Sequence, residues 1–240
     1  MHTSTSIIVD PATTWPPKAT TTSLAVLVSG GLDSAILLAE SVRTYPAVFP
    51  IYIHTGAVWE NVEREYLTRF LAALRSPVLR SLTILEMPVT DLYGRHWSLT
   101  GEDVPDANTP DVAVFLPGRN VILLSKALIW CHLHGVPELA MAPLAFNPFP
   151  DATPEFYDSF AAVVAQSLGS AKPVCVLRPY AMLGLHKSDV LRRGKGLPLE
   201  LTFSCISPVE GRHCGECNKC AERKAGFIIA KVPDPTVYMA

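Results

Sequence analysis

A short apolar run followed at once by two adjacent glycines is the feature that most constrains this fold. Residues 24–28 are all apolar, and they lead directly into Ser29-Gly30-Gly31-Leu32-Asp33-Ser34. An apolar run of this length, ended by a turn, is typical of a parallel strand buried on both faces. Adjacent glycines let the backbone turn tightly and approach a ligand closely. We expect a helix over Ala35–Arg43 to follow, with Asp33 and Ser34 at its N-cap.

Strand and helix patterns alternate along the rest of the chain. Further apolar runs predict strands at Val48–His54, Ser81–Met87, Glu138–Met141 and Val174–Leu177. Helical spacing and end signals predict helices at Glu60–Leu74, Asn120–His134, Pro154–Leu168, His186–Arg193 and Asn218–Ala230. This alternation indicates an α/β fold, in which helices flank both faces of a parallel, Rossmann-like sheet.

Some segments carry more detailed predictions about burial and helix ends. The helix over Asn120–His134 is apolar nearly all round, which predicts a central, buried helix. Gly194 is expected to stop the helix before it. Cys131 and Cys175 stand in apolar stretches and are expected in the core. Residues 91–117 are irregular and rich in Gly, Pro and Asp, which favours a functional loop over a simple connector.

The Ser-Gly-Gly turn also has the properties of an anion site. A helix start presents free N–H groups and the positive end of the helix dipole, and Ser29 and Ser34 add hydroxyl donors. Asp33 is a poor phosphate contact unless a magnesium ion lies between the two. The sequence contains neither G-x-x-x-x-G-K-[ST] nor G-x-G-x-x-G, so this is not one of the two commonest nucleotide loops. The alternative is a turn that only links a strand to a helix.

Four cysteines near the end of the chain have metal-ligand spacing. They form C-x8-C-x2-C-x2-C and are Cys205, Cys214, Cys217 and Cys220. Four thiolates are a preferred set for structural zinc, and an iron–sulfur cluster is the alternative. Because a thiol fills every position, we expect the metal to pin the C-terminal segment onto the sheet rather than to act in catalysis. Arg212, Lys219 and Arg223 surround the thiols and are expected to offset some of their negative charge.

Charge and hydropathy narrow the class of protein. The 240 residues contain 22 acidic and 20 basic side chains, a net charge of −2, which disfavours nucleic-acid binding through bulk charge. No apolar run reaches the roughly 18 residues of a membrane span. Residues 1–23 lack the pattern of a secretory signal, so a cytoplasmic protein is expected. Rich in Thr, Ser and Pro, they are expected to form a loose arm, or an arm that docks on a neighbouring subunit.

The segment Ser29–Ser34 resembles the loop of the PP-loop ATP pyrophosphatase superfamily, whose fold is that of the adenine-nucleotide alpha-hydrolases. Combined with the cysteine motif, it resembles one family in particular, the 7-cyano-7-deazaguanine synthases of queuosine-precursor biosynthesis. The other matching segments are Phe115-Leu116-Pro117-Gly118-Arg119-Asn120, Pro150-Asp151 with Glu155-Phe156, Lys187 in Leu185-His186-Lys187-Ser188, and Cys220-x-x-Arg223. The resemblance covers roughly Leu24–Ile229.

The resemblance implies an ATP-dependent carbon–nitrogen ligase that uses ATP, Mg²⁺ and Zn²⁺. In this family's reaction 7-carboxy-7-deazaguanine is adenylated, ammonia gives the amide, and a second adenylation permits loss of water to the nitrile. We expect free ammonia from solution, because no glutaminase-like stretch is present, and a homodimer. Residues 24–200 would form the ATP-binding domain, and residues 201–240 a zinc-binding segment packed on it.

The resemblance also assigns site residues. The loop residues expected to hold pyrophosphate and magnesium are Ser29, Gly30, Gly31, Leu32, Asp33 and Ser34. Asp33, Arg119 and Lys187 are expected to be catalytic, and the two cations would neutralise charge developing on the phosphates. The alternatives are a surface or ion-pair arginine and a solvated lysine. His54 ends the second strand, where α/β sheets place ligand contacts, and is expected at the nucleotide or in a structural role. Asn120 either contacts ligand or caps its helix.

Three segments depart from the family's pattern, all where the acceptor would bind. The family's Tyr-Gly followed by Gln-Arg-His is replaced by Thr55-Gly56-Ala57-Val58-Trp59. Its Cys-Arg pair is Ala152-Thr153, and its upstream Thr-Gly is Ala142-Pro143. Arginine recognises a carboxylate in a bidentate way that alanine and threonine cannot. The acceptor is therefore the carboxylated deazaguanine, or a different carboxylate or deazapurine. A tRNA-modifying PP-loop enzyme and a nucleotide-binding partner protein are the remaining alternatives.

Overall fold

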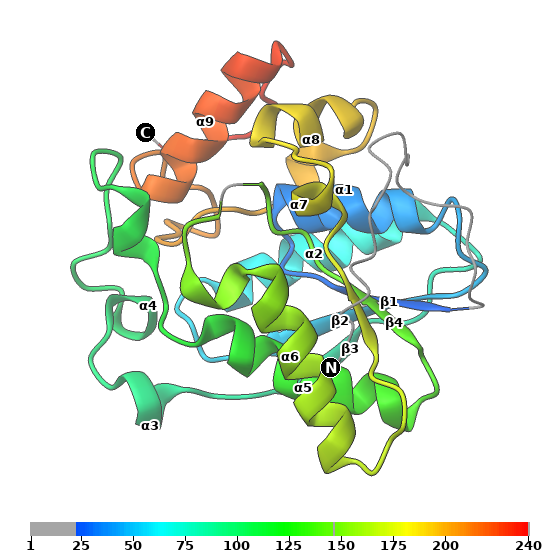
Figure 1. Ribbon diagram of the computed structural model, residues 1–240. Helices are drawn as coiled ribbons and strands as arrows, with labels where there is room; N and C mark the ends of the chain where they lie inside the picture. The colour runs from blue at the N-terminus through cyan, green and yellow to red at the C-terminus, as the bar shows by residue number, and fades with distance from the viewer. Residues whose placement is uncertain (1–22, 146, 240) are drawn as a thin grey trace.

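The computed structural model describes residues 23–145 and 147–239, so the expected arm lies outside the described residues apart from Ser23. Five parallel strands form one sheet in the order β3-β2-β1-β4-β5 (Figure 1). The strands are β1 (Leu24–Leu27), β2 (Val48–His54), β3 (Thr83–Glu86), β4 (Glu138–Ala140) and β5 (Cys175–Leu177). The predicted α/β fold with a parallel sheet is confirmed.

The central strand, β1, pairs with β2 on one side and with β4 on the other. Leu24 is in register with Val48, and Ala25 is in register with both Phe49 and Leu139. The chain therefore builds the sheet outward from β1 in one direction and then returns to build it in the other. In open α/β sheets, ligands bind at the carboxyl ends of the strands where the order reverses in this way.

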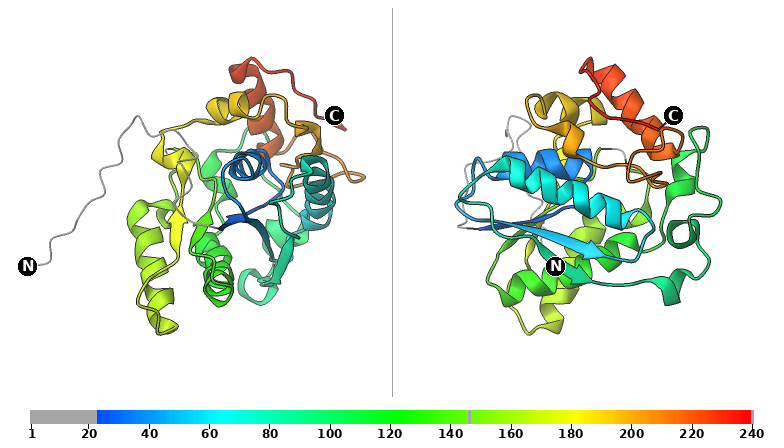
Figure 2. Two further views of the ribbon diagram at one scale, coloured as in Figure 1. Left: turned by 90° about the vertical axis from the view of Figure 1, so that its right-hand side faces the viewer. Right: turned by 180° about the vertical axis from the view of Figure 1, so that it is seen from behind.

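Helices cover both faces of the sheet, as Figures 1 and 2 show. The helices of the first layer are α1 (Leu32–Ser41), α2 (Glu60–Leu74), α7 (Pro179–Met182), α8 (Lys187–Arg193) and α9 (Asn218–Ala230). The second layer consists of α5 (Arg119–Leu133) and α6 (Pro154–Ser167). Strand alternation divides the core accordingly: Leu24 and Val26 pack with the first layer, and Ala25 and Leu27 with the second.

The remaining elements are single helical turns. They are α3 (Thr90–Tyr93), α4 (Trp97–Thr100) and the 3-10 turns η1 (Asp111–Val114), η2 (Pro150–Ala152) and η3 (Leu199–Leu201). The elements α3, α4 and η1 lie between residues 90 and 114, so the irregular stretch predicted there contains only short helical turns. None of the helices in residues 23–145 and 147–239 is long and apolar enough to cross a membrane.

The start of α1 differs from the prediction. Its N-cap is Gly31, which is extended (φ −71°, ψ 166°), and Leu32, Asp33 and Ser34 form the first turn. The predicted N-cap at Asp33 and Ser34 is wrong, because the extended glycine lets the chain enter the helix three residues earlier. This places the Asp33 side chain on the first helical turn, directly beside the glycine turn.

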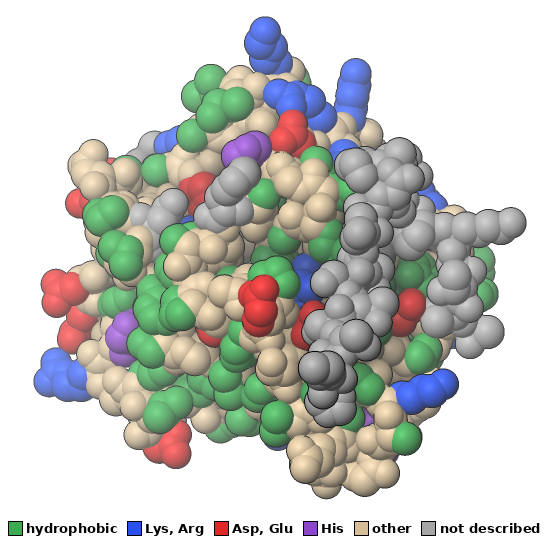
Figure 3. Space-filling model, in the orientation of Figure 1, with side chains coloured by type: hydrophobic (Ala, Val, Ile, Leu, Met, Phe, Trp, Pro, Cys, Tyr) green, Lys and Arg blue, Asp and Glu red, His purple; other side chains and the backbone are tan. Residues whose placement is uncertain are grey.

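The predicted all-round burial of α5 is also wrong. Its inner face packs on the sheet through residues such as Leu124 and Leu128, whereas Val121 and Leu133 are exposed. Figure 3 shows hydrophobic side chains at the surface over α5 and α6, and Lys and Arg side chains over the end formed by α8 and α9. A helix on one face of a sheet can bury only the side that meets the strands.

One smaller prediction, on Cys175, also needs correction, whereas that on Gly194 is confirmed. Cys131 is fully buried as expected, but Cys175 is exposed, because β5 is an edge strand in which Val176 alone is fully covered. Gly194 is the C-cap of α8, which confirms the predicted helix end, and its φ is −76°. A Cβ there would lie 2.6 Å from Cδ1 of Ile36, so close packing of α8 on α1 requires the glycine.

Candidate active site

The glycine turn between β1 and α1 is held in a single shape by its serines. The Ser34 hydroxyl accepts a hydrogen bond from the Ser29 N–H (3.2 Å) and lies 3.2 Å from the carbonyl oxygen of Gly31. Gly30 has φ +72°, and a Cβ at this position would lie 3.1 Å from both Cγ and the carbonyl oxygen of Glu63. Only glycine fits this combination of conformation and contact. The loop is therefore fixed before any ligand arrives.

Two adjoining cavities open beside this loop at the carboxyl ends of β1, β2 and β4. Their volumes are about 290 Å³ and about 440 Å³. Ser29, Gly31, Asp33 and Arg119 line both, so these residues stand at the junction of the two compartments. Lys187 lines the larger cavity. Thus the structure brings together the loop, Arg119 and Lys187, although Ser29 and Lys187 are 158 positions apart in the sequence.

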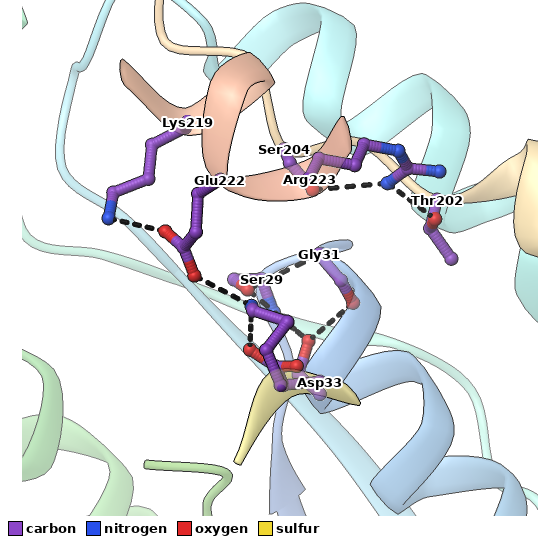
Figure 4. Close-up of polar contacts among 10 residues, drawn as sticks. Ser29, Gly31, Asp33, Thr202, Ser204, Lys219, Glu222 and Arg223 are labelled. Atoms are coloured by element: carbon purple, nitrogen blue, oxygen red, sulfur yellow. Dashed lines mark hydrogen bonds and ion pairs between the residues drawn. The ribbon is translucent and has the colours of Figure 1, made fainter. Parts of the chain in front are cut away.

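A row of alternating charges crosses the larger cavity (Figure 4). The Lys187 Nζ lies 2.5 Å from Oδ2 of Asp33 and 3.1 Å from Oε1 of Glu222, and Oε2 of Glu222 lies 2.7 Å from Nζ of Lys219. Burial would raise the pKa of Glu222, but Lys187 and Lys219 outweigh it and lower the pKa to about 2. Burial would lower the pKa of Lys187, but Asp33 and Glu222 raise it above the ordinary value. Glu222 and Lys187 are therefore both charged at neutral pH.

The other carboxylate oxygen of Asp33, Oδ1, is a candidate ligand for a metal ion. Its Oδ1 is buried and has no hydrogen-bond partner among the described residues. A buried carboxylate oxygen without a partner is costly, and magnesium prefers carboxylate and phosphate oxygens as ligands. The position on the first turn of α1, beside the loop, fits a magnesium ion that would join Asp33 to a bound triphosphate.

A buried carboxyl group that the sequence analysis did not identify, Glu63, lines both cavities. Glu63 of α2 accepts a hydrogen bond from the Tyr52 hydroxyl (2.6 Å), and both side chains are buried. Burial raises the pKa of Glu63 to about 8, although the Tyr52 hydrogen bond and the charge of Arg119 act in the opposite direction. At neutral pH Glu63 is thus mainly a neutral carboxylic acid, which can donate a hydrogen bond to a ligand.

Asn120 neither caps its helix nor stands free in the cavity. The N-cap of α5 is Gly118. The Asn120 N–H donates to Oδ2 of Asp151 (2.9 Å), and its side-chain amide donates to the Asp151 carbonyl (2.8 Å) and to the Tyr157 hydroxyl (3.3 Å). Asn120, Asp151 and Tyr157 all line the smaller cavity. The expected helix cap is therefore wrong, and Asn120 instead ties α5 to the turn η2.

His54 ends β2 as predicted but lines neither cavity. Its Nδ1 lies 2.5 Å from Oε2 of Glu86, and its Nε2 lies 3.3 Å from Oε2 of Glu60. The Glu60 carboxylate in turn accepts hydrogen bonds from the Thr55 N–H and hydroxyl and from the Gly56 N–H. This arrangement gives His54 a structural role in the β2–α2 turn, the alternative that the sequence left open.

Three of the positions that depart from the family's pattern, Ala57, Ala152 and Thr153, line neither cavity. Ala57 packs against the cluster around the four cysteines, and Thr153 caps α6 by accepting from the Phe156 N–H (3.1 Å). Ala152 is likewise not among the residues that line either cavity, whereas Ala142 and Pro143 line both. The smaller cavity is walled instead by aromatic side chains, including the stacked rings of Phe115 and Phe149, 4.9 Å apart.

The four cysteines of the C-terminal segment converge on one point. Their sulfur atoms lie within 4.8 Å of one another, and all four side chains are buried. Cys205 and Cys217 are 3.8 Å apart, and Cys214 and Cys220 are 3.9 Å apart. Four thiolates around a single zinc ion at about 2.3 Å lie about 3.8 Å from one another. The donor set and its spacing therefore fit one tetrahedral ion.

Arg223 joins α9 to the residues just before Cys205 and to Thr236. It is 1% exposed, and its guanidinium donates to the Thr202 and Ser204 hydroxyls, the Leu199 carbonyl and the Thr236 hydroxyl. Burial lowers the pKa of Arg223. The expectation that Arg223 offsets some of the thiolate charge is thus incomplete, because its donors are used on this polar network. Lys219, from the same expectation, lines the larger cavity.

These features define the class of protein. A parallel sheet that presents a Ser-Gly-Gly-x-Asp-Ser loop where its strand order reverses is the architecture of a PP-loop ATP-binding protein. A solved structure of a 4-thiouridine synthetase–RNA complex with bound ATP shares the fold, with a TM-score of 0.50 and 16% identity. That likeness covers 92% of this chain and 49% of the other.

Sequence comparison narrows the class to one family. The model of the queuosine biosynthesis protein QueC matches residues 23–231. A 7-cyano-7-deazaguanine synthase of Xanthomonas oryzae pv. oryzae (strain PXO99A) is 33% identical over 222 residues, which cover 89% of this chain and 96% of the relative. The synthase of Syntrophobacter fumaroxidans is 32% identical over 234 residues, covering 89% and 95%. The chain belongs to the QueC family and is an ATP-dependent, adenylating, ligase-type enzyme, which confirms the resemblance.

Proposed function

We propose that this enzyme converts 7-carboxy-7-deazaguanine and ammonia into 7-cyano-7-deazaguanine at the expense of ATP. The observation that carries the proposal is the joining, in one cleft, of the phosphate loop and an aromatic-walled compartment of about 290 Å³. A flat, bicyclic acid suits walls such as Phe115 and Phe149. Membership of the QueC family supports the same substrate.

In the proposed reaction a carboxylate oxygen attacks the α-phosphorus of ATP, and pyrophosphate leaves. Ammonia then attacks the acyl carbon of the adenylate, AMP leaves and the amide forms. The amide oxygen attacks a second ATP in the same way, and departure of AMP with loss of the nitrogen's protons gives the nitrile. The N–H groups and hydroxyls of Ser29–Ser34 would hold the β- and γ-phosphates, which leaves the α-phosphorus open to the neighbouring compartment.

Arg119 and Lys187 have different positions in this scheme. Arg119 lines both compartments, so it would stabilise the charge that develops on the α-phosphate during attack. Lys187 lines only the larger one and would face the departing pyrophosphate. Mg²⁺, held by the buried Oδ1 of Asp33, would supply further positive charge to the phosphates. Asn120 and Asp151 line the smaller compartment and would orient the acceptor.

We propose Zn²⁺ for the four-cysteine site. The short separations of the sulfur atoms, 3.8 Å and 3.9 Å for two pairs, support a single ion. An iron–sulfur cluster holds its thiolates across several metal and sulfide atoms, which needs wider spacing than these four show. Metal analysis of protein purified without oxygen tests this: one zinc per chain supports the proposal, and iron with acid-labile sulfide would overturn it.

We also propose that the enzyme is a cytoplasmic homodimer that uses free ammonia. A dimer is supported by the family resemblance and by apolar side chains that α5 leaves exposed, Val121 and Leu133. Light scattering of the purified chain tests the dimer, and an assay with ammonium as the sole nitrogen donor tests the use of free ammonia.

The activity itself is tested by incubating the enzyme with ATP, magnesium, ammonium and 7-carboxy-7-deazaguanine, followed by mass spectrometry. We expect the nitrile, with the amide as an intermediate, and two AMP per nitrile. Arg119→Ala is the matched negative variant, and Arg43→Ala, which changes an arginine beyond the end of α1 and outside both cavities, is the control. Neither amide nor nitrile from active, metal-loaded protein would contradict the proposed acceptor.

A second candidate is adenylation of a different carboxylate or deazapurine. It is favoured by the replacement of the family's Thr-Gly by Ala142-Pro143, which line both cavities and offer no side-chain hydrogen bond. Pyrophosphate release measured with a panel of aromatic acids separates the two candidates. Release that requires another acid, with none for 7-carboxy-7-deazaguanine, would favour this second candidate.

A further inference from the structure

Lys219 belongs to the cysteine segment, yet its side chain lines the phosphate end of the cleft. It lies on the first turn of α9, between Cys217 and Cys220. It lines the cavity of about 440 Å³ together with Asp33 and Lys187. From the sequence alone, Lys219 is one of several positive charges around the thiolates. The structure shows that Lys219 also lines the larger cavity.

The ion pair between Lys219 and Glu222 is partly buried and lies in the cleft. An exposed pair of this spacing contributes little to stability, but here both side chains are about one-third exposed and both line the cleft. The other oxygen of Glu222 lies 3.1 Å from the Lys187 Nζ. One carboxylate therefore holds two ammonium groups next to each other, and Figure 4 shows Glu222 between Lys219 and the Asp33 contact.

The packing of α9 on α8 fixes this arrangement. Gly226 lies one helical turn beyond Glu222, and a Cβ there would be 2.8 Å from Cγ of Lys187. The absence of a side chain lets the stem of Lys187 pass directly under α9 toward Glu222. The two helices cannot slide without breaking this fit, so the two lysines are held in a fixed relation to the loop.

The hydrogen bonds of Lys219 leave donors for a ligand. An ammonium group has three N–H donors, and within the described part of the chain Lys219 makes one hydrogen bond, to Glu222 at 2.7 Å. A carboxylate near bound phosphates would repel them unless its own charge were taken up by cations. With each oxygen on a different lysine, Glu222 serves to orient Lys187 and Lys219 rather than to face the anion.

We propose that Lys219 binds the pyrophosphate that leaves ATP, and that Glu222 is the positioning residue that holds Lys219 and Lys187 over the loop. The inference rests on the proposed function, because it takes ATP as the ligand of the larger compartment. It gives the cysteine segment a second role: the metal fixes the first turn of α9, and that turn carries a cation into the cleft.

The test compares Lys219→Met and Lys219→Arg with Lys195→Met, which changes an exposed lysine outside both cavities. Calorimetric titrations of the full, metal-loaded chain use magnesium pyrophosphate, magnesium-ATP and AMP. We expect Lys219→Met to weaken pyrophosphate and ATP binding by the same factor, about tenfold, as for the loss of one charge-assisted hydrogen bond. AMP binding should be unchanged, Lys219→Arg should restore most of the affinity, and Lys195→Met should match the unmodified enzyme.

Glu222→Gln tests the positioning role, because the two possible roles of Glu222 predict opposite changes in pyrophosphate affinity. If the carboxylate only repelled phosphates, removing its charge would strengthen pyrophosphate binding. We expect weaker binding with an unchanged metal content, because the glutamine amide no longer holds both ammonium groups. Pyrophosphate affinity that is unchanged in Lys219→Met, or stronger in Glu222→Gln, would overturn the inference. An unmodified enzyme that binds neither ATP nor pyrophosphate would instead refute the proposed function.

Discussion

The ammonium nitrogen of Lys187 lies 2.5 Å from Oδ2 of Asp33, although 154 residues separate the two in the sequence. Asp33 is on the first turn of α1, and Lys187 is the first residue of α8. Their contact is formed because α8 packs across α1 through side chains of one buried cluster, including Ile36 and Val190. The fold of the first layer thus brings a cation to the phosphate loop before ATP is bound.

The Asp33–Lys187 contact predicts a strong effect of removing the cation. Lys187→Met should lower kcat/KM by about 100-fold or more, the usual cost of one lost donor to developing charge. The shape of the side chain is kept, so the fold should be retained. Steady-state kinetics and a thermal melt measure the two effects.

Lys195→Met, outside the cleft, is the control for the kinetics. Full activity of Lys187→Met would show that Lys187 is a solvated lysine, the alternative considered from the sequence. A large fall in the melting temperature without a change in kcat/KM would assign Lys187 a role in folding only.

Gly30 offers a test of the loop itself. Gly30→Ala forces a Cβ onto a residue at φ +72° and within 3.1 Å of Glu63. We expect a loss of about 1–3 kcal/mol of stability from the strained backbone, together with loss of magnesium-ATP binding because the loop must shift. Urea unfolding and calorimetry measure these. Gly135→Ala has a similar φ of +64° but open space around the Cβ, so it should lose stability and keep ATP binding.

Much of the fold was predictable because its strands and helices are dictated locally. The predicted limits of β2, α2 and α9 agree with the structure residue for residue, since each has clear apolar periodicity and end signals. The start of α1 was missed because Gly31 is extended and allows the helix to begin before the expected cap. Exposure of Cys175 depends on β5 being an edge strand, which local sequence does not reveal.

The site was only partly predictable, for a related reason. The loop and the four cysteines are contiguous motifs, so their residue types and spacing are visible in the sequence. Glu63 becomes important only because α2 buries it against Tyr52 beside Gly30. The one available signal was a pair of acidic residues three apart, Glu60 and Glu63, in the first turn of α2. Such pairs are common on solvated helices, so the chemistry follows from burial.

Burial of Glu63 predicts a distinctive pH dependence of stability. Its folded-state pKa is raised from 4.5 to about 8, so the native state holds a proton that the unfolded chain releases. Stability is therefore fully present below about pH 4.5 and is lost as pH rises to about 8, at up to roughly 1.4 kcal/mol per pH unit. Urea unfolding between pH 5 and 8.5 measures the slope.

Glu63→Gln keeps the hydrogen bond from Tyr52 and removes the titration, so the slope over this range should flatten. Glu65→Gln changes an exposed carboxyl on the same helix and should leave the slope as it is. Equal slopes in Glu63→Gln and the unmodified protein would mean that Glu63 is ionised at neutral pH.

Loss of the metal is expected to reach the ATP site through α9. Cys217→Ser removes one of four converging ligands, and a structural ion contributes folding free energy. We expect the free energy of unfolding to fall by roughly 3 kcal/mol, which lowers the melting temperature by about 10 °C in a chain of this length. Because Glu222 and Lys219 lie on the helix that Cys217 and Cys220 fix, magnesium-ATP binding should weaken as well.

The control is Cys175→Ser, which changes an exposed cysteine on β5 and should keep both the metal and the affinity for ATP. Metal analysis with calorimetry decides: a metal-free Cys217→Ser protein with full ATP affinity would separate the cysteine segment from the phosphate site.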